Sequence, residues 1–165
     1  MKTLFIVRHA KSSWDSPGIR DFDRPLMEIG KKRTRKVIQF FLDKKVRIDL
    51  IISSPAVRAY ETAKIIAKGI GYPIKSIKLE PDIYEGEPDR IIDMICRTDN
   101  DYSGLMIVGH NPSLTYLTNH FLKPGIEILP TSGVAAISFK ADSWENIPGA
   151  DASCEFLLYP KQLKK

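Results

Sequence analysis

The sequence has 165 residues with a formal net charge of +5, 43% hydrophobic and 27% charged, which is typical of a globular protein that favours anionic ligands. Its two cysteines form no CxxC pair and no histidine stands at metal-ligand spacing, which argues against a disulfide framework and a zinc site. No run approaches the ~20 apolar residues of a membrane helix. We therefore expect one cytoplasmic domain over residues 1–165 that uses no cofactor and no membrane, with fraying at residues 161–165.

The first predicted elements are a strand, a polar loop and a helix. The continuous apolar run at residues 4–7 predicts a strand covered on both faces. The helix is predicted over about 28–44, and its buried face comprises Thr34, Val37, Ile38 and Phe41. Its basic run at residues 31–36 lies between these positions, so we interpret that run as a solvated face.

The middle of the chain alternates strands with helices. A second buried strand is predicted at 49–53, and Ser54-Pro55 is expected to open the next helix, because serine caps well and proline suits the first turn. Gly71-Tyr72-Pro73 ends that helix. A short strand near 76–79, a loop from Pro81 to Pro88 and a helix over 88–97 follow.

The last third begins with a strong buried strand at 105–109. Asn111-Pro112 repeats the cap-then-proline signal for a helix that runs to about residue 122. Two closing strands are predicted over 133–139 and 154–159. The alternation predicts an α/β fold with three layers, α/β/α, and a largely parallel sheet.

Three strand-to-helix junctions carry the residues that point to function. They bear Arg8-His9, Arg58 and His110. Parallel sheets bind ligands beyond the carboxyl ends of their strands, so these junctions are expected to open on one edge. Each residue alone has an ordinary structural explanation. Together they are costly to bury unless an anion compensates them, and a phosphoryl group accepts the paired hydrogen bonds that arginine offers.

The motifs at these junctions resemble those of a known family. The strings VRHA, SSPAVRAYETA and IVGHNPSL, in this order within residues 2–118, are similar to the histidine phosphatase superfamily, whose fold is phosphoglycerate-mutase-like. RHAKSSW, DFDRPL and the glycine at position 30 resemble the short SixA-type phosphohistidine phosphatases of that superfamily.

The resemblance implies a role for each residue of the predicted cluster. His9 matches the nucleophile that becomes transiently phosphorylated, and Arg8, Arg58 and His110 match the groups that clamp the phosphoryl oxygens. A nucleophilic imidazole nitrogen keeps its lone pair only if the other ring nitrogen holds the proton. We expect a backbone carbonyl near residues 9–13 to hold that proton in place.

Other positions are open to more than one interpretation. Glu85 lies where many members keep the proton donor, and it is catalytic, tunes substrate choice or is a solvated loop carboxylate. Lys11 and Ser13 line the pocket or belong to a polar loop. A further set is expected to fix the loop by mutual pairing: Asp21, Asp23 and Arg24.

Two positions depart from the family pattern. Ala10 stands where the common motif has glycine, which is acceptable if its φ is not positive. Asp15 follows Trp14 where the mutase pattern has asparagine, and a carboxylate repels phosphate, so Asp15 is expected to point away.

The leading hypothesis is a phosphatase that removes the phosphoryl group from protein phosphohistidine, with a phosphorylated protein as partner. A phosphatase for small phosphate esters such as sugar phosphates is the alternative in the same class. A phosphate- or phosphopeptide-binding module without turnover is the non-enzyme alternative. Nucleic acid is not an expected partner, because no recognition motif accompanies the basic residues between 31 and 47.

Overall fold

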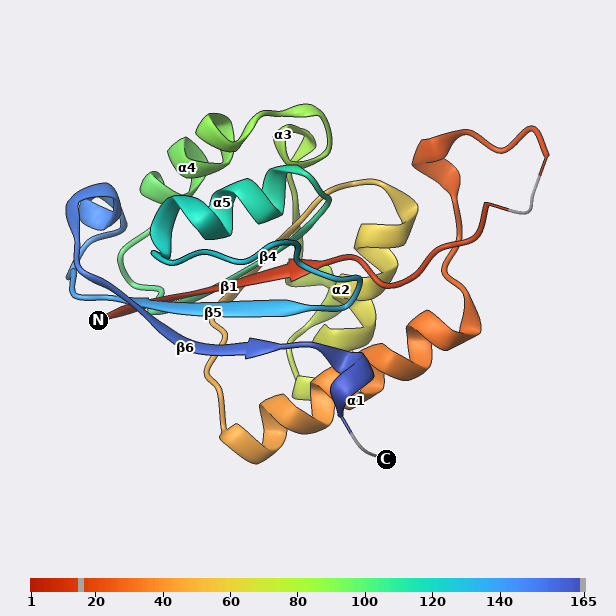
Figure 1. The fold of residues 1–165 in the computed structure, drawn as a ribbon, viewed down its shortest axis with the longest axis horizontal. Coiled ribbons are helices and arrows are strands. Elements are labelled where there is room, and N and C mark those ends of the chain that lie inside the picture. The colour runs from red at the N-terminus through yellow and green to blue at the C-terminus, as the bar shows by residue number, and fades with distance from the viewer. Residues whose placement is uncertain (15–16, 164–165) are drawn as a thin grey trace.

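A six-stranded sheet lies at the centre of the computed structural model, which describes residues 1–14 and 17–163 (Figure 1). Its strands are β1 (Lys2–Arg8), β2 (Leu50–Ser53), β3 (Lys78–Leu79), β4 (Gly104–Gly109), β5 (Val134–Phe139) and β6 (Ala152–Leu158). They are ordered β3-β2-β4-β1-β5-β6. The first four of that order pair in parallel, whereas β5 and β6 are antiparallel. The predicted α/β fold with a largely parallel sheet is confirmed.

Helices cover both faces of this sheet (Figure 1). The α-helices are α1 (Glu28–Lys44), α2 (Val57–Ile70), α3 (Pro81–Glu85), α4 (Pro88–Cys96) and α5 (Ser113–Phe121). Short 3-10 helices are η1 (Asp21–Asp23), η2 (Ile74–Ser76), η3 (Trp144–Gly149) and η4 (Pro160–Gln162). The apolar faces of α1 and α2 pack on one side of the sheet, and those of α3, α4 and α5 pack on the other. This gives the three layers.

The apolar run of β1 divides between the two layers of helices. Leu4 and Ile6 belong to the core cluster under α4 and α5, and Phe5 and Val7 belong to the cluster under α1 and α2. None of the four is more than 3% exposed. Successive side chains of a strand point to opposite faces, so a continuous apolar run is the pattern that a strand covered on both faces requires.

Two local predictions are wrong. α2 begins at Val57 and not at Ser54-Pro55, because the Ser54 hydroxyl accepts from the Ala56 N–H in a turn before the helix. The predicted loop from Pro81 to Pro88 contains α3, which begins with Pro81 and is capped by the Glu80 side chain. The same cap-then-proline signal predicts the helix after Asn111, and the Asn111 side chain accepts from the Thr115 N–H.

The predictions about Asp15 and about Lys164 and Lys165 lie outside the described residues. The tail up to Leu163 contains η4, which packs near α1, and Lys36 Nζ donates to the Leu163 carbonyl at 3.3 Å. None of the helices in the described ranges is long and apolar enough to cross a membrane.

The start of α1 packs against the loop that follows β1. Gly30 faces this loop so closely that a Cβ atom there would lie 2.5 Å from the Lys11 carbonyl oxygen and 2.8 Å from the Lys11 nitrogen. The Lys11 carbonyl also accepts from the Met27 N–H at 2.9 Å. The helix therefore fixes the backbone two residues beyond His9.

Gly30→Ala is expected to destabilise the protein by about 1–3 kcal/mol, because the loop backbone must move to admit the methyl group. This outweighs the ~1 kcal/mol by which alanine is a better helix former than glycine. Urea denaturation measures the change. Gly149→Ala is the control, since a Cβ there meets nothing within 4 Å. Equal or greater stability of Gly30→Ala would show that the loop is not held by this contact.

Candidate active site

Three strands that are neighbours in the sheet end at one edge. Arg8 is the last residue of β1 and pairs with Gly109, the last residue of β4, so His9 and His110 leave the sheet side by side. Their ring centroids are 5.2 Å apart. β2 ends at Ser53, opposite Val108 of β4, and leads into the turn before α2. The parallel sheet therefore brings the predicted junctions together.

His9 is buried and its ring is fixed by the backbone. Only 7% of the residue is exposed, and Nδ1 lies 2.7 Å from the Ala10 carbonyl oxygen. A carbonyl only accepts hydrogen bonds, so Nδ1 carries the proton and Nε2 keeps its lone pair. Burial, together with the charges of Arg58 and Arg8, lowers the pKa of His9 to about 4. The predicted carbonyl partner is thus present, and the imidazole is neutral at neutral pH.

His110 is held by a hydroxyl group. Its Nε2 lies 2.8 Å from the Ser54 Oγ, and the ring of Tyr84 packs edge-on against it. Burial, and then the neighbouring His9 and Arg58, lowers the pKa of His110 to about 3. The second ring nitrogen, Nδ1, is buried without a hydrogen-bond partner in the described part of the chain.

Arg58 lies in the first turn of α2 and is 6% exposed. Its Nη1 donates to the Asp21 carbonyl at 2.7 Å, and its Nη2 donates to the Asp21 carboxylate at 3.1 Å. Arg8 donates from Nη1 to the Leu129 carbonyl at 3.2 Å. Burial, and then the charge of Arg58, lowers the pKa of Arg8. Arg58 therefore lies close enough to disfavour the charged form of Arg8.

The buried side-chain nitrogens without a partner, within residues 1–14 and 17–163, all belong to this cluster. They are Arg8 Nε, Arg58 Nε and His110 Nδ1. A buried donor without an acceptor costs about 1–3 kcal/mol, so proteins rarely keep three in one place. An anion with several acceptor oxygens satisfies all of them, as a phosphoryl group does.

Asp21 has a role that the sequence does not reveal. Its carboxylate accepts from Tyr84 Oη at 2.8 Å, from Arg24 Nη1 at 3.1 Å and from Arg58. Burial alone would raise its pKa, but these hydrogen bonds and the charge of Arg58 lower the pKa of Asp21 to about 2. The predicted pairing of Asp21 with Arg24 is present, whereas Asp23 pairs with Arg20. The spacing indicated a local pair, but nothing in the sequence links Asp21 to Arg58 or Tyr84.

Thr62 is a second supporting residue that the motifs do not single out. Its Oγ1 accepts from the Ala10 N–H at 2.9 Å and donates to the Arg58 carbonyl at 2.7 Å. One buried hydroxyl thus connects the loop after His9 to the helix that carries Arg58. The sequence signal for it is a threonine one turn after Arg58 in the string RAYETA, and the structure shows that this threonine is fully buried.

The remaining predicted residues lie around this cluster. Lys11 is exposed and borders a groove that Arg8 also lines. Ser13 is half-buried, and its carbonyl accepts from Arg24 Nε at 3.1 Å. Glu85 is exposed at the end of α3, next to Tyr84. Within the described ranges, no set of three or more His, Cys, Asp or Glu side chains is arranged to hold a metal ion.

Comparison with known proteins decides the family. The model of the histidine phosphatase superfamily (branch 1) matches residues 4–87, the segment that contains His9, Arg58 and Glu85. The chain belongs to the histidine phosphatase superfamily. An uncharacterized chloroplastic protein of Arabidopsis thaliana is 30% identical over 152 residues, which cover 87% of this chain and 69% of that protein. The predicted superfamily is confirmed, and with it the broader expectation of a phosphatase.

Solved structures agree on the fold. The protein histidine phosphatase SixA complexed with tungstate has a TM-score of 0.82 at 22% identity, covering 98% of this chain and 99% of that one. A candidate phosphohistidine phosphatase SixA from Agrobacterium tumefaciens also has a TM-score of 0.82, at 25% identity, covering 96% and 98%. A mycobacterial glucosyl-3-phosphoglycerate phosphatase has a TM-score of 0.65 at 14% identity, covering 93% and 97%. The predicted SixA-type, phosphoglycerate-mutase-like architecture is confirmed.

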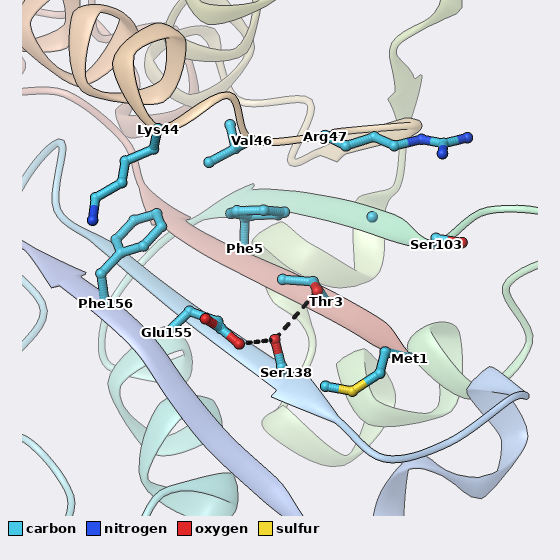
Figure 2. Close-up of a pocket in the computed structure, with 11 residues that line it drawn as sticks. Met1, Thr3, Phe5, Lys44, Val46, Arg47, Ser103, Ser138, Glu155 and Phe156 are labelled. Carbon is cyan, nitrogen blue, oxygen red and sulfur yellow. Dashed lines mark hydrogen bonds between the residues drawn. The ribbon is translucent and has the colours of Figure 1, made fainter.

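A second pocket lies at the opposite end of β1, near Met1 and Thr3 (Figure 2). It has a volume of about 320 Å³. Ser138 lies between Thr3 and Glu155 there and hydrogen-bonds to both, at 3.3 and 2.5 Å (Figure 2). Because these polar groups satisfy each other, the pocket lacks the buried unpaired donors that distinguish the cluster around His9.

The two buried histidines make stability depend on pH. The unfolded chain binds protons at His9 and His110 near the ordinary pKa of 6.5, whereas the folded protein binds them only at about 4 and 3. The free energy of unfolding therefore decreases as pH falls from about 6.5 toward 4, by about 3 kcal/mol for His9 alone.

Urea denaturation between pH 7 and 4.5, above the pKa of Asp21 at about 2, measures this slope. His9→Gln is expected to flatten it markedly. His120→Gln, which alters an exposed histidine on α5, is the control and keeps the slope. A slope that His9→Gln leaves unchanged would contradict the burial of a neutral His9.

Proposed function

We propose that this phosphatase hydrolyses phosphohistidine in a partner protein, with His9 as the nucleophile. The observation that carries the proposal is the neutral, backbone-fixed imidazole of His9 near the buried Arg58 and the half-buried Arg8, whose charges lower its pKa. Phosphoryl transfer asks a protein mainly for positioning and for compensation of charge on the equatorial oxygens. In this proposal Arg8, Arg58 and His110 provide that compensation, and the roles expected from the family resemblance have a physical basis.

The reaction proceeds in two displacements. His9 Nε2 attacks phosphorus, the bond between phosphorus and the substrate imidazole nitrogen breaks, and the departing nitrogen takes up a proton from solvent. Water then attacks phospho-His9, its phosphorus–nitrogen bond breaks, and inorganic phosphate leaves. The Ala10 carbonyl holds the proton on Nδ1 throughout, which keeps Nε2 the reactive atom.

His110 acts as a hydrogen-bond donor in this scheme. If the Ser54 hydroxyl donates to Nε2, the neutral ring carries its proton on Nδ1, the buried nitrogen without a partner. Nδ1 then donates to a phosphoryl oxygen. The low pKa of His110, about 3, makes this neutral form the resting state, and a dianionic ligand favours its protonation.

Asp21 is unsuited to protonate a leaving group. It is the carboxylate in contact with Arg58, and its pKa of about 2 keeps it ionised at neutral pH, so it donates no proton to a leaving group. An alkoxide needs such a proton as it departs, whereas an imidazole is a much better leaving group. The similarity to SixA proteins supports the same substrate class, and the similarity to a sugar-phosphate phosphatase supports the alternative of a small ester.

Parallel turnover of a protein phosphorylated on histidine and of a panel of sugar phosphates tests this function. The wild type is expected to act fastest on phosphohistidine. His9→Ala is expected to reduce turnover more than ~10³-fold while leaving the fold intact, because the nucleophile is lost. Brief incubation of the wild type with substrate is expected to trap acid-labile, alkali-stable phosphate on His9. Faster turnover of sugar phosphates would overturn the choice of substrate, and an active His9→Ala would overturn the mechanism.

Glu85→Gln tests the remaining candidate for a proton donor. We expect hydrolysis of alkyl phosphates to slow by roughly 10²–10⁴-fold, the usual range for general acid catalysis, an aryl phosphate to be barely affected and phosphohistidine only modestly. Glu87→Gln removes an exposed carboxylate two residues away and is the control. An equal loss on all three substrates would show that Glu85 only shapes the pocket, and no loss would make it a solvated carboxylate.

A further inference from the structure

A groove of about 500 Å³ adjoins the candidate active site and has no part in the mechanism above. Arg8 is one of the residues that line it, and the other cations that line it are Lys11, Arg33 and Lys161. They come from the end of β1, the loop after it, α1 and η4. Segments from both ends of the chain therefore form one surface that includes Arg8, a residue of the His9 cluster.

Within residues 1–14 and 17–163, nothing compensates the charge of this groove, and no Asp or Glu side chain lines it. Arg33, Lys11 and Lys161 form no ion pair with any carboxylate of residues 1–14 and 17–163, whereas Arg20, Arg47 and Arg90 elsewhere do. Four cations without counter-ions attract a negatively charged ligand and repel a basic one.

The groove also has apolar walls. They are formed by Ile128, Pro130, Tyr159 and Pro160, and Ile128 is 56% exposed. A second phosphate group would use the cations alone and would leave the apolar walls in water. An extended peptide with acidic and apolar side chains uses both. The lining therefore fits a segment of protein chain better than a small bisphosphate or a nucleic-acid backbone.

Arg33 belongs to the basic run on α1 and also lines this groove. The sequence pattern alone indicates a solvated helix face, and Thr34, Val37 and Phe41 do form its buried side. Arg33 is half-buried and lines the groove with Arg8. One residue of the run thus faces this groove and not only bulk solvent.

We propose that this groove binds an acidic segment of the phosphorylated partner protein, next to its phosphohistidine. The inference rests on the proposed function, because the occupant must be continuous with the phosphoryl group that Arg8 contacts. Rim charges of this kind change association and salt dependence more than the chemical step. The groove therefore determines KM for protein substrates and leaves small substrates unaffected.

Two phosphohistidine peptides of equal length test the groove, one with Asp and Glu around the phosphohistidine and one with Ser and Gln there. p-Nitrophenyl phosphate, which is too small to reach the groove, is the third substrate. The wild type is expected to show a kcat/KM about tenfold higher for the acidic peptide, through KM, as a few exposed ion pairs allow. Added salt is expected to abolish the difference.

The double variant Arg33→Glu/Lys161→Glu is expected to lose this preference with unchanged kcat/KM for p-nitrophenyl phosphate. Lys68→Glu/Lys75→Glu makes the same change in net charge on α2 and η2 and is expected to keep the preference. If p-nitrophenyl phosphate turnover shows that the double variant has not folded, the single variant Arg33→Ala replaces it and is expected to lose part of the preference.

Each other outcome overturns the proposal. Equal kcat/KM for both peptides in the wild type removes the groove as a determinant and leaves the phosphohistidine phosphatase intact, as does a preference that the groove variants retain. A random single-stranded oligonucleotide that inhibits more strongly than the unphosphorylated acidic peptide assigns the groove to nucleic acid. Turnover of p-nitrophenyl phosphate with neither peptide hydrolysed overturns the proposed function, and the groove proposal with it.

Discussion

The parallel pairing of β1 with β4, and of β4 with β2, is the constraint on which the site depends. Arg8 is paired with Gly109, and Ser53 with Val108, so three chain segments leave the sheet at the same edge. Each then turns into a loop or helix that carries one or two of the basic groups. Apolar side chains of the strands are buried on both faces of the sheet. This burial stabilises the fold and offsets the cost of placing polar and charged groups together at its edge.

The edge itself is electrostatically unfavourable in the free protein. The half-buried Arg8 lies with the buried Arg58 and two buried imidazoles, and the structure accommodates them by keeping both histidines neutral, at pKa values of about 4 and 3. Asp21 compensates part of the charge of Arg58. It leaves the Arg58 Nε without a partner, so the guanidinium is positioned but not fully satisfied. A site of this kind is stabilised by an anion and destabilised by protons, which joins ligand binding and pH dependence through the same residues.

The fold and the central cluster can be predicted from the sequence, because both follow from short-range patterns. Apolar runs mark β1, β2 and β4, and polar residues directly after them mark Arg8, His9 and His110. The start of α2 and the short α3 were mispredicted, since a serine before proline forms a turn in one case and Glu80 caps a helix in the other. Local propensity does not show that Ser54 also contacts His110, a residue 56 positions away.

Side-chain hydrogen bonds between distant segments cannot be predicted from the sequence. Asp21 reaches Arg58 across 37 positions, and Thr62 reaches Ala10 across 52. Neither pair follows from spacing or periodicity, and both become visible only when η1, the loop after His9 and α2 are placed together. The roles of three other residues, Glu85, Lys11 and Ser13, stay predictions. Their contribution depends on where a substrate lies and not on their own neighbours.

Selectivity has to come from groups outside the cluster around His9. In the proposed mechanism Arg8, Arg58 and His110 touch only phosphoryl oxygens, which are alike in a phosphohistidine, a sugar phosphate and a phosphoserine. These residues therefore stabilise the same transferring group whatever it departs from, and they cannot by themselves discriminate among substrates. Discrimination then rests on the leaving atom, which Asp21 cannot protonate, and on the surface beyond Arg8, where uncompensated cations and apolar walls meet. For the proposed function, a nitrogen leaving group is the one that needs no proton from Asp21, and the proposed groove adds a preference for an acidic protein.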